Sequence, residues 1–239
     1  MIDSLASDHV PSTTGMNPPL SDRHLRAIER AIRAAWQLIL TDRAASAIVG
    51  RGREVPITKL MLEHLERLRI HGGSPGYDAS SFERPMPAPE FYDYQETRVR
   101  KPDLVFFLSG QPRPGVVDSL YDGLAVECKV IGVAAATVAE YSRAGIRRFV
   151  DGGYGWRMNQ GMMCAYVFSA ERLPTALEGY FQLHAVSDRL SIRDLKLVRS
   201  RLTSEKPYAY LSRHDRSWKF QDGTAPGDIE LRHLWLTVV

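Results

Sequence analysis

Apolar residues recur at the helical period in two stretches of the N-terminal half. In residues 25–39 they occupy positions 25, 28, 32, 36 and 39, and Ser21 or Asp22 is placed to cap the helix. In residues 57–70 they occupy positions 57, 60, 61, 65 and 68, and His71-Gly72-Gly73 follows as a stop. The pattern therefore predicts two amphipathic helices in this half of the chain.

Four short apolar runs predict strands instead, over residues 99–108, 124–130, 161–168 and 229–238. The segment between the first two runs is rich in glycine and proline, which favours a hairpin connection between adjacent strands. A third helix is expected over residues 134–150, where Asp151-Gly152-Gly153 would end it. Helix, strands, helix and strand thus follow one another, an order typical of α/β proteins.

Three charged residues lie in the first two of these strands. Asp103 follows Pro102, and Glu127 and Lys129 are two residues apart. Because side chains alternate between the faces of a strand, Glu127 and Lys129 project to one side, and Asp103 can meet them if the strands pair. Two carboxylates and one ammonium on a sheet suit a metal-assisted hydrolase, since Mg²⁺ prefers carboxylate oxygens, backbone carbonyls and water.

This arrangement resembles the PD-(D/E)xK nuclease superfamily, with Pro102-Asp103 as the first half of the motif and Glu127-Cys128-Lys129 as the second. The resemblance implies that Asp103 and Glu127 hold Mg²⁺, for which Mn²⁺ would substitute. It also implies that the backbone carbonyl of Cys128 helps to hold the metal. Lys129 is then expected to activate water and stabilise the transition state.

The same resemblance implies a restriction-endonuclease-like α/β core, a central mixed sheet flanked by helices in the order αβββαβ. An N-terminal helix and a C-terminal α/β extension would be added to it. Residues 1–20 are expected to form a flexible arm and residues 21–239 a single nuclease domain. Within that domain the core covers about residues 50–170 and a basic extension covers residues 171–239.

Some members of the superfamily carry a further acidic residue near the first helix. Glu54 and Glu63 are the candidates here, and Glu54 is preferred as a fourth catalytic residue. A glutamate near a helix start is equally well explained by the helix dipole, so both interpretations of Glu54 stay open.

Arginines alternate with aromatic residues in the segment 141–160, beside the expected active site. Their cations could contact phosphates, as most hydrogen bonds between proteins and DNA do. The alternative is that the aromatic residues belong to the core while the arginines are solvated or pair with Asp151 and Glu140. The residues expected to bind nucleic acid are Arg143, Arg147, Arg148 and Tyr154.

Two other basic regions have the same two interpretations. The first predicted helix carries Arg23, Arg26, Arg30 and Arg33 opposite its apolar face. Residues 189–219 combine an excess of lysine and arginine with tyrosine and tryptophan. Each is either an ordinary solvated face or a surface that contacts phosphates.

Composition places limits on the class of protein. The net charge of +3 permits a polyanionic partner. The N-terminus lacks the basic start and apolar core of a secretory signal, and no apolar run is long enough for a membrane span. The two cysteines cannot build a disulfide framework, and no Cys/His spacing indicates zinc. A cytoplasmic protein without a membrane partner is expected.

These observations favour a Mg²⁺-dependent endonuclease that hydrolyses DNA phosphodiester bonds, as a restriction or phage-defence effector. Its expected partners are DNA and either a second copy in a homodimer or another subunit of a defence complex. One alternative is a catalytically silent nucleic-acid-binding or assembly subunit that keeps the nuclease fold. Another is a small-molecule hydrolase that uses the same metal ligands.

Overall fold

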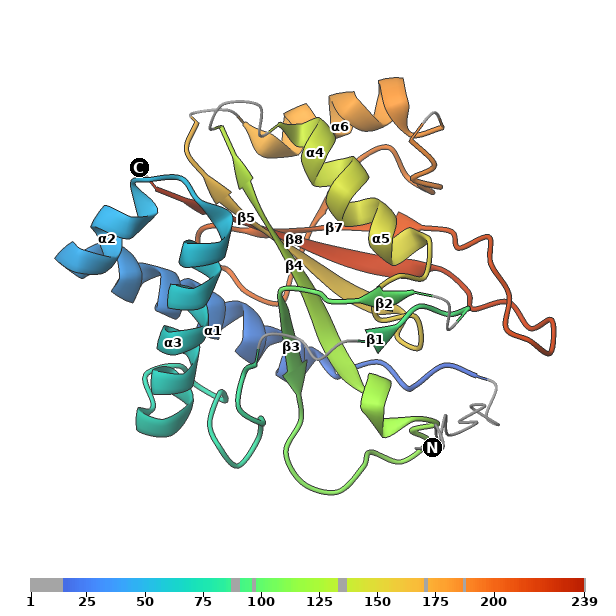
Figure 1. Cartoon of the computed structure of the whole chain (residues 1–239), viewed down its shortest axis with the longest axis horizontal. Coiled ribbons are helices and arrows are strands. Elements are labelled where there is room, and N and C mark those ends of the chain that lie inside the picture. The colour runs from blue at the N-terminus through green and yellow to red at the C-terminus, as the bar shows by residue number, and fades with distance from the viewer. Residues whose placement is uncertain are drawn as a thin grey trace, which may run out of the picture.

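The computed structural model of this chain centres on a six-stranded mixed sheet with strand order β3-β4-β5-β8-β7-β6 (Figure 1). The structure describes residues 15–86, 91–95, 98–132, 137–169, 172–186 and 188–238. The strands are β3 (Leu104–Phe107), β4 (Gly123–Ile131), β5 (Gln160–Val167), β6 (Val198–Arg199), β7 (Ala209–His214) and β8 (Ile229–Thr237). A mixed α/β architecture is therefore confirmed.

The directions of the strands divide the sheet into three parts. β3 and β4 pair antiparallel, which confirms the predicted hairpin. β4, β5 and β8 run parallel to one another in the middle of the sheet. β7 and β6 continue antiparallel at the other end.

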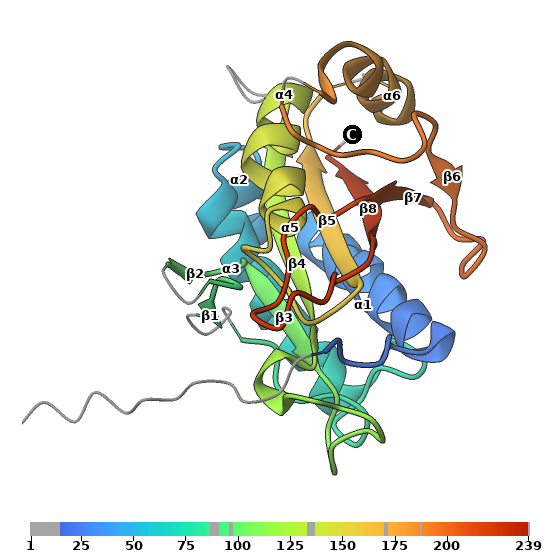
Figure 2. The ribbon, with the colours of Figure 1, turned by 90° about the vertical axis from the view of Figure 1, so that its right-hand side faces the viewer.

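Helices cover both faces of this sheet (Figure 2). The long helices α1 (Asp22–Thr41) and α3 (Glu54–His71), joined by the short α2 (Arg43–Val49), pack on one face. On the other face lie α6 (Leu173–His184) and one continuous helical segment made of α4 (Val138–Tyr141), η2 (Ser142–Ile146) and α5 (Arg147–Val150). The alternating side chains of β4 separate these layers, since Val126 and Cys128 belong to the core beneath α1 and α3.

The first two helices form where the apolar period predicts them. Ser21 caps α1 by accepting a hydrogen bond from the backbone N–H of His24, and Gly72 ends α3. Two of the exposed-face arginines of α1 also make tertiary contacts. Arg26 donates to the carbonyl of Leu202, and Arg30 pairs with Glu205, so these cations attach α1 to the segment between β6 and β7.

The single strand predicted over residues 99–108 is wrong. β2 (Val99–Arg100) pairs with β1 (Phe91–Tyr92) in a separate two-stranded sheet, and β3 begins only at Leu104. Pro102 lies in the break. It has no N–H to donate to a ladder, so it favours the end of one strand before the next begins.

The helix predicted over residues 134–150 starts later, at Val138, and residues 133–136 lie outside the described residues. Its middle, Ser142–Ile146, is a π turn. Gly145 lies in this turn, and a Cβ there would overlap Met163 of β5. The absence of a side chain thus lets the helix pack directly on the sheet.

The C-terminal segment expected as an extension is part of the central sheet. It supplies β6, β7 and β8, three of the six strands, and β8 lies between β5 and β7. At the other end of the chain, residues 1–14 of the expected arm lie outside the described residues. The side chain of Asn17 accepts hydrogen bonds from the backbone N–H groups of Val117 and Asp118, and Leu20 is buried, so the end of the arm packs on the domain.

Among the helices of the described ranges, none combines the length and apolar character that crossing a bilayer requires.

Candidate active site at the open edge of β4

The predicted charged cluster forms where β3 stops pairing with β4. The last pair of this ladder is Leu104 with Val126, so Asp103 comes next to Glu127. The Oδ2 atom of Asp103 accepts a hydrogen bond of 2.7 Å from the backbone N–H of Cys128. A side-chain carboxylate thus takes the place of a strand carbonyl, and this contact fixes Asp103 beside the second half of the motif.

Glu127 lies at the centre of the cluster with a side chain that is only 2% exposed. Its Oε1 atom lies 2.8 Å from Nζ of Lys129 and 3.0 Å from a guanidinium nitrogen of Arg148. The predicted common side of Glu127 and Lys129 is therefore confirmed. The buried carboxylate is paired with two cations, as burial of a charge requires.

Three oxygens surround the ammonium of Lys129. Besides Glu127, its Nζ atom lies 3.2 Å from Oε1 of Glu54 and donates a 2.8 Å hydrogen bond to the carbonyl of Cys128. Glu54 is in the first turn of α3, so this contact joins the helix to the sheet. Glu63 is exposed on the same helix, where it lines a different cavity with Glu66 and Arg84. Of the two candidates, only Glu54 reaches the cluster, and it contacts the lysine.

Opposing effects set the pKa values in this cluster. Burial raises the pKa of Glu127 to about 7, and the negative charge of Asp103 adds to this effect, while Lys129 and Arg148 oppose it. Burial alone would lower the pKa of Lys129, but Glu127, Glu54 and Asp103 raise it above its ordinary value. Lys129 is consequently a cation at neutral pH, and electrostatic stabilisation suits it better than proton abstraction.

Arg148 and Tyr154 complete the cluster on the side of α5. The guanidinium of Arg148 lies 2.5 Å from the hydroxyl of Tyr154, which in turn donates to the carbonyl of Lys101. Tyr154 is 2% exposed, and burial raises its pKa to about 12. The buried ring and its neutral hydroxyl thus hold Arg148 in position. The side chain of Arg148 is 40% exposed and can reach a ligand.

The other two expected nucleic-acid contacts do not join this cluster. Arg147 pairs with Asp151 one turn along its own segment, at 2.9 Å, as the alternative interpretation had it. Arg143 pairs instead with Asp188, beyond the end of α6, at 3.3 Å. Consecutive residues on a helix point about 100° apart, so only Arg148 of this group faces β4.

The two carboxylates fit a magnesium site of the kind that takes its remaining ligands from water and substrate. Asp103 and Glu127 are near enough for the charge of one to raise the pKa of the other, a repulsion that a divalent cation between them would relieve. The carbonyl of Cys128 lies at the same place and accepts from Lys129. Within the described ranges, no group of three or more His, Cys, Asp or Glu side chains is placed to hold a metal ion.

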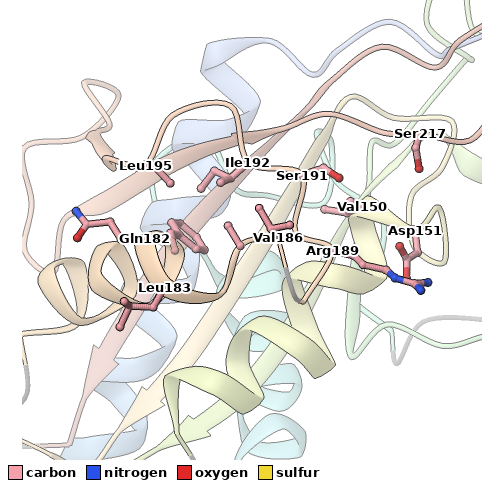
Figure 3. A pocket seen from close by; sticks show the side chains of 12 residues that line it. Val150, Asp151, Gln182, Leu183, Val186, Arg189, Ser191, Ile192, Leu195 and Ser217 are labelled. Atoms are coloured by element: carbon pink, nitrogen blue, oxygen red, sulfur yellow. The ribbon is translucent and has the colours of Figure 1, made fainter.

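A cavity of about 750 Å³ lies elsewhere, between the end of α6 and the segment that follows it (Figure 3). Its lining is mixed, with apolar side chains such as Leu183 and Val186 beside the charged Asp151 and Arg189. None of the clustered charged residues lines it. It does not contain the paired carboxylates and lysine of the charged edge of β4, so it is the weaker candidate for metal-assisted hydrolysis.

Two buried polar networks were not anticipated from the sequence. Glu29 of α1 is fully buried with Arg33 and Arg232. Its place among the apolar positions 25, 28 and 32 is the signal that could have revealed it. In the second network the hydroxyl of Ser212 lies 2.7 Å from both His214 of β7 and His233 of β8.

No protein-family model, curated protein or solved structure matches the chain. Any functional assignment therefore rests on the geometry of this cluster.

Proposed function

We propose that this chain is a Mg²⁺-dependent nuclease of the PD-(D/E)xK type that hydrolyses phosphodiester bonds in DNA. One observation carries the proposal: Asp103, Glu127 and Lys129 converge at an edge of β4 that β3 leaves open. The sequence placed these residues on two strands, and the pairing of those strands brings their charged groups into one cluster.

In this proposal Asp103 and Glu127 hold the metal, assisted by the carbonyl of Cys128. When bound, Mg²⁺ would polarise the scissile phosphate and lower the pKa of a coordinated water. The ammonium of Lys129, positioned by Glu54, stabilises the negative charge that develops on the phosphate. Arg148 turns its exposed side to the backbone of the substrate.

The order of elements around the cluster also supports a restriction-endonuclease-like core. α3 precedes β3 and β4, the helical segment 138–150 follows them, and β5 then pairs parallel with β4. Before β3, Phe82 and Met86 form antiparallel bridges with Leu108 and Val105 of the β3 region. That segment lies where the first of the three core strands would be.

The experiment that tests this function is cleavage of plasmid and linear DNA in Mg²⁺ or Mn²⁺, with the purified full chain. We expect cutting that EDTA and Asp103→Asn each abolish. Asp194→Asn is the matched control, because it changes an exposed aspartate outside the cluster in the same way. Cutting that survives Asp103→Asn would refute the site.

A second candidate is a nucleic-acid-binding subunit without catalysis. Its support is that Glu127 and the Cys128 carbonyl are already bonded to Lys129 and Arg148, so a metal has to compete with these cations. DNA binding that depends on Arg148, without cutting at any Mn²⁺ concentration, would favour this function over the nuclease.

A further inference from the structure

A cavity of about 390 Å³ lies at α1, apart from the charged edge of β4. It is formed by α1, by residues 73–75 beyond the end of α3, and by residues 205–206 between β6 and β7. Figure 2 shows that connection beside α1, on the side of the molecule that β6 and β7 form. The polar side chains that line the cavity are Arg30, Arg33, Gln37, Ser74, Glu205 and Lys206.

The lining carries more positive than negative charge. Three cations face one carboxylate, and that carboxylate, on Glu205, is paired with Arg30 at 3.1 Å. Arg33 and Lys206 therefore remain as the cations that Glu205 does not pair. Lys206 has an exposed side chain, so an approaching anion meets it without any rearrangement of the fold.

Arg33 is held rigidly while part of its hydrogen-bonding capacity is unused. Its side chain is 6% exposed, its Nε donates to the carbonyl of Pro207, and one terminal nitrogen pairs with Glu29. The other terminal nitrogen, Nη1, is buried and has no partner among the described residues. Burial lowers the pKa of Arg33, which indicates a cation whose charge Glu29 compensates incompletely.

A second buried donor in the same lining is also unsatisfied. The hydroxyl of Ser74 is buried and has no partner among the residues that the structure describes. Buried polar groups in folded proteins are nearly always paired, and an unpaired group calls for a ligand or an ordered water. Both residues line the same cavity, together with the exposed Lys206.

We infer that this cavity binds the phosphate group of a small phosphomonoester. Phosphate oxygens accept from guanidinium, hydroxyl and ammonium groups, which are the donors that Arg33, Ser74 and Lys206 present. The volume lies within the usual range for small-molecule sites, so the cavity can take more than the phosphate, up to a molecule of mononucleotide size. The site shares no residue with the proposed nuclease site and does not depend on that activity.

The test is titration of the full chain with inorganic phosphate and with a 5′-mononucleotide, at constant ionic strength, followed by calorimetry and by thermal unfolding. We expect saturable binding of both probes and a melting temperature that rises with their concentration. Ser74→Ala and Lys206→Glu should each weaken binding by about tenfold or more, because each removes a charge-assisted hydrogen bond.

Lys219→Glu is the matched control, because it makes the same charge change on an exposed lysine outside the cavity. Ser74→Ala removes no hydrogen bond seen in the structure, so the variant should fold normally. Absent binding, or equal affinity in the wild type and both variants, would overturn the inference. A DNA oligonucleotide that competes with the phosphate and binds more tightly than the mononucleotide would overturn the small-molecule assignment in favour of a nucleic-acid backbone.

Discussion

Glu127 and Glu29 are both buried glutamates paired with two cations, but they lie in different surroundings. Glu127 contacts Lys129 and Arg148 at the open edge of β4. Glu29 contacts Arg33 at 3.3 Å and Arg232 at 3.1 Å, between α1 and β8. Composition alone does not distinguish these two clusters.

The carboxylate oxygens show the difference. Both oxygens of Glu29 are bonded, Oε1 to Arg232 and Oε2 to Arg33 and to the hydroxyl of Thr203. The cationic contacts of Glu127 are both made by Oε1. Glu127 also has a second carboxylate, that of Asp103, beside it. Its partner Arg148 is partly exposed, whereas both cations around Glu29 are almost completely buried.

A buried charge that is bonded on all sides holds elements together, whereas one that faces a second carboxylate at an open strand edge can do chemistry. Glu29 is of the first kind, and it joins α1 to β8 and to the segment before β7. Glu127 is of the second kind: its pKa is raised and one of its partner cations, Arg148, is partly exposed, which are features of functional sites. Four experiments would break or sharpen this contrast.

The largest expected effect is on cleavage by Glu127→Gln. Removing this carboxylate's charge removes a metal ligand, whose contribution of several kcal/mol corresponds to a rate loss of about 10³-fold or more. The single-turnover rate of DNA cleavage in Mg²⁺ measures it. The unfolding free energy in EDTA should not fall, and a variant that cuts at the wild-type rate would refute the role of Glu127.

The next effect is on stability, through Glu29→Gln. This change leaves Arg33 and Arg232 buried without their counter-charge, which costs about 3–5 kcal/mol when a buried ion pair is broken. Urea unfolding followed by circular dichroism measures the loss. If Glu29→Gln is as stable as the wild type, then the cluster at α1 does not hold the fold together.

The third effect is a contribution to the pH dependence of stability that Glu127→Gln should remove. Its pKa in the folded chain is about 7, above the ordinary 4.5, so the folded state binds the proton more tightly than the unfolded state. The resulting stabilisation is complete below pH 4.5 and is lost as the pH rises through 7, by about 3 kcal/mol.

The difference in urea unfolding between the wild type and Glu127→Gln, at several pH values in EDTA, measures this contribution. Burial lowers the pKa of His214 and His233, which acts in the opposite direction, but both histidines are present in the two proteins and cancel in the difference. Glu127→Gln should lack this loss between pH 4.5 and 7, whereas Glu29→Gln should retain it from a lower baseline. Equal slopes in the wild type and Glu127→Gln would mean that Glu127 ionises normally in the folded chain.

The smallest effect separates two adjacent arginines. Arg148→Ala should slow cleavage by about 10–100-fold, since residues that support metal ligands have effects of this size. Arg147→Ala should leave the rate unchanged, because Arg147 pairs only with the exposed Asp151 in the described structure. Partial rescue by Arg148→Lys would show that the charge matters, and equal effects of the two alanine variants would contradict the assignment.

Most elements and the central triad could be predicted from local pattern. The period of α1 and α3 and the apolar runs of β4, β5 and β8 are properties of short stretches of chain. The alternation along β4 was sufficient to place Glu127 and Lys129 together. The break at Pro102 was missed, although the proline and the charged residues Arg100, Lys101 and Asp103 around it were the signal.

The remaining features depend on distant parts of the chain. Arg148 and Arg143 have the same chemistry and lie on one helical segment, yet only Arg148 faces Glu127. The sequence favours Glu54 only slightly over Glu63 as the acidic residue that supports the cluster, and the packing of α3 against the edge of β4 distinguishes them. No local pattern indicated that β8, from the end of the chain, would lie in the middle of the sheet.

The sequence by itself determined which residues are candidates for chemistry and which faces of the helices and strands are apolar, because both follow from residue type and from periods of a few residues. Only the tertiary structure decided which charges meet. Glu127 and Glu29 are equally buried, but their surroundings come from segments far apart in the chain, so the pairing that distinguishes them is a property of the packed molecule.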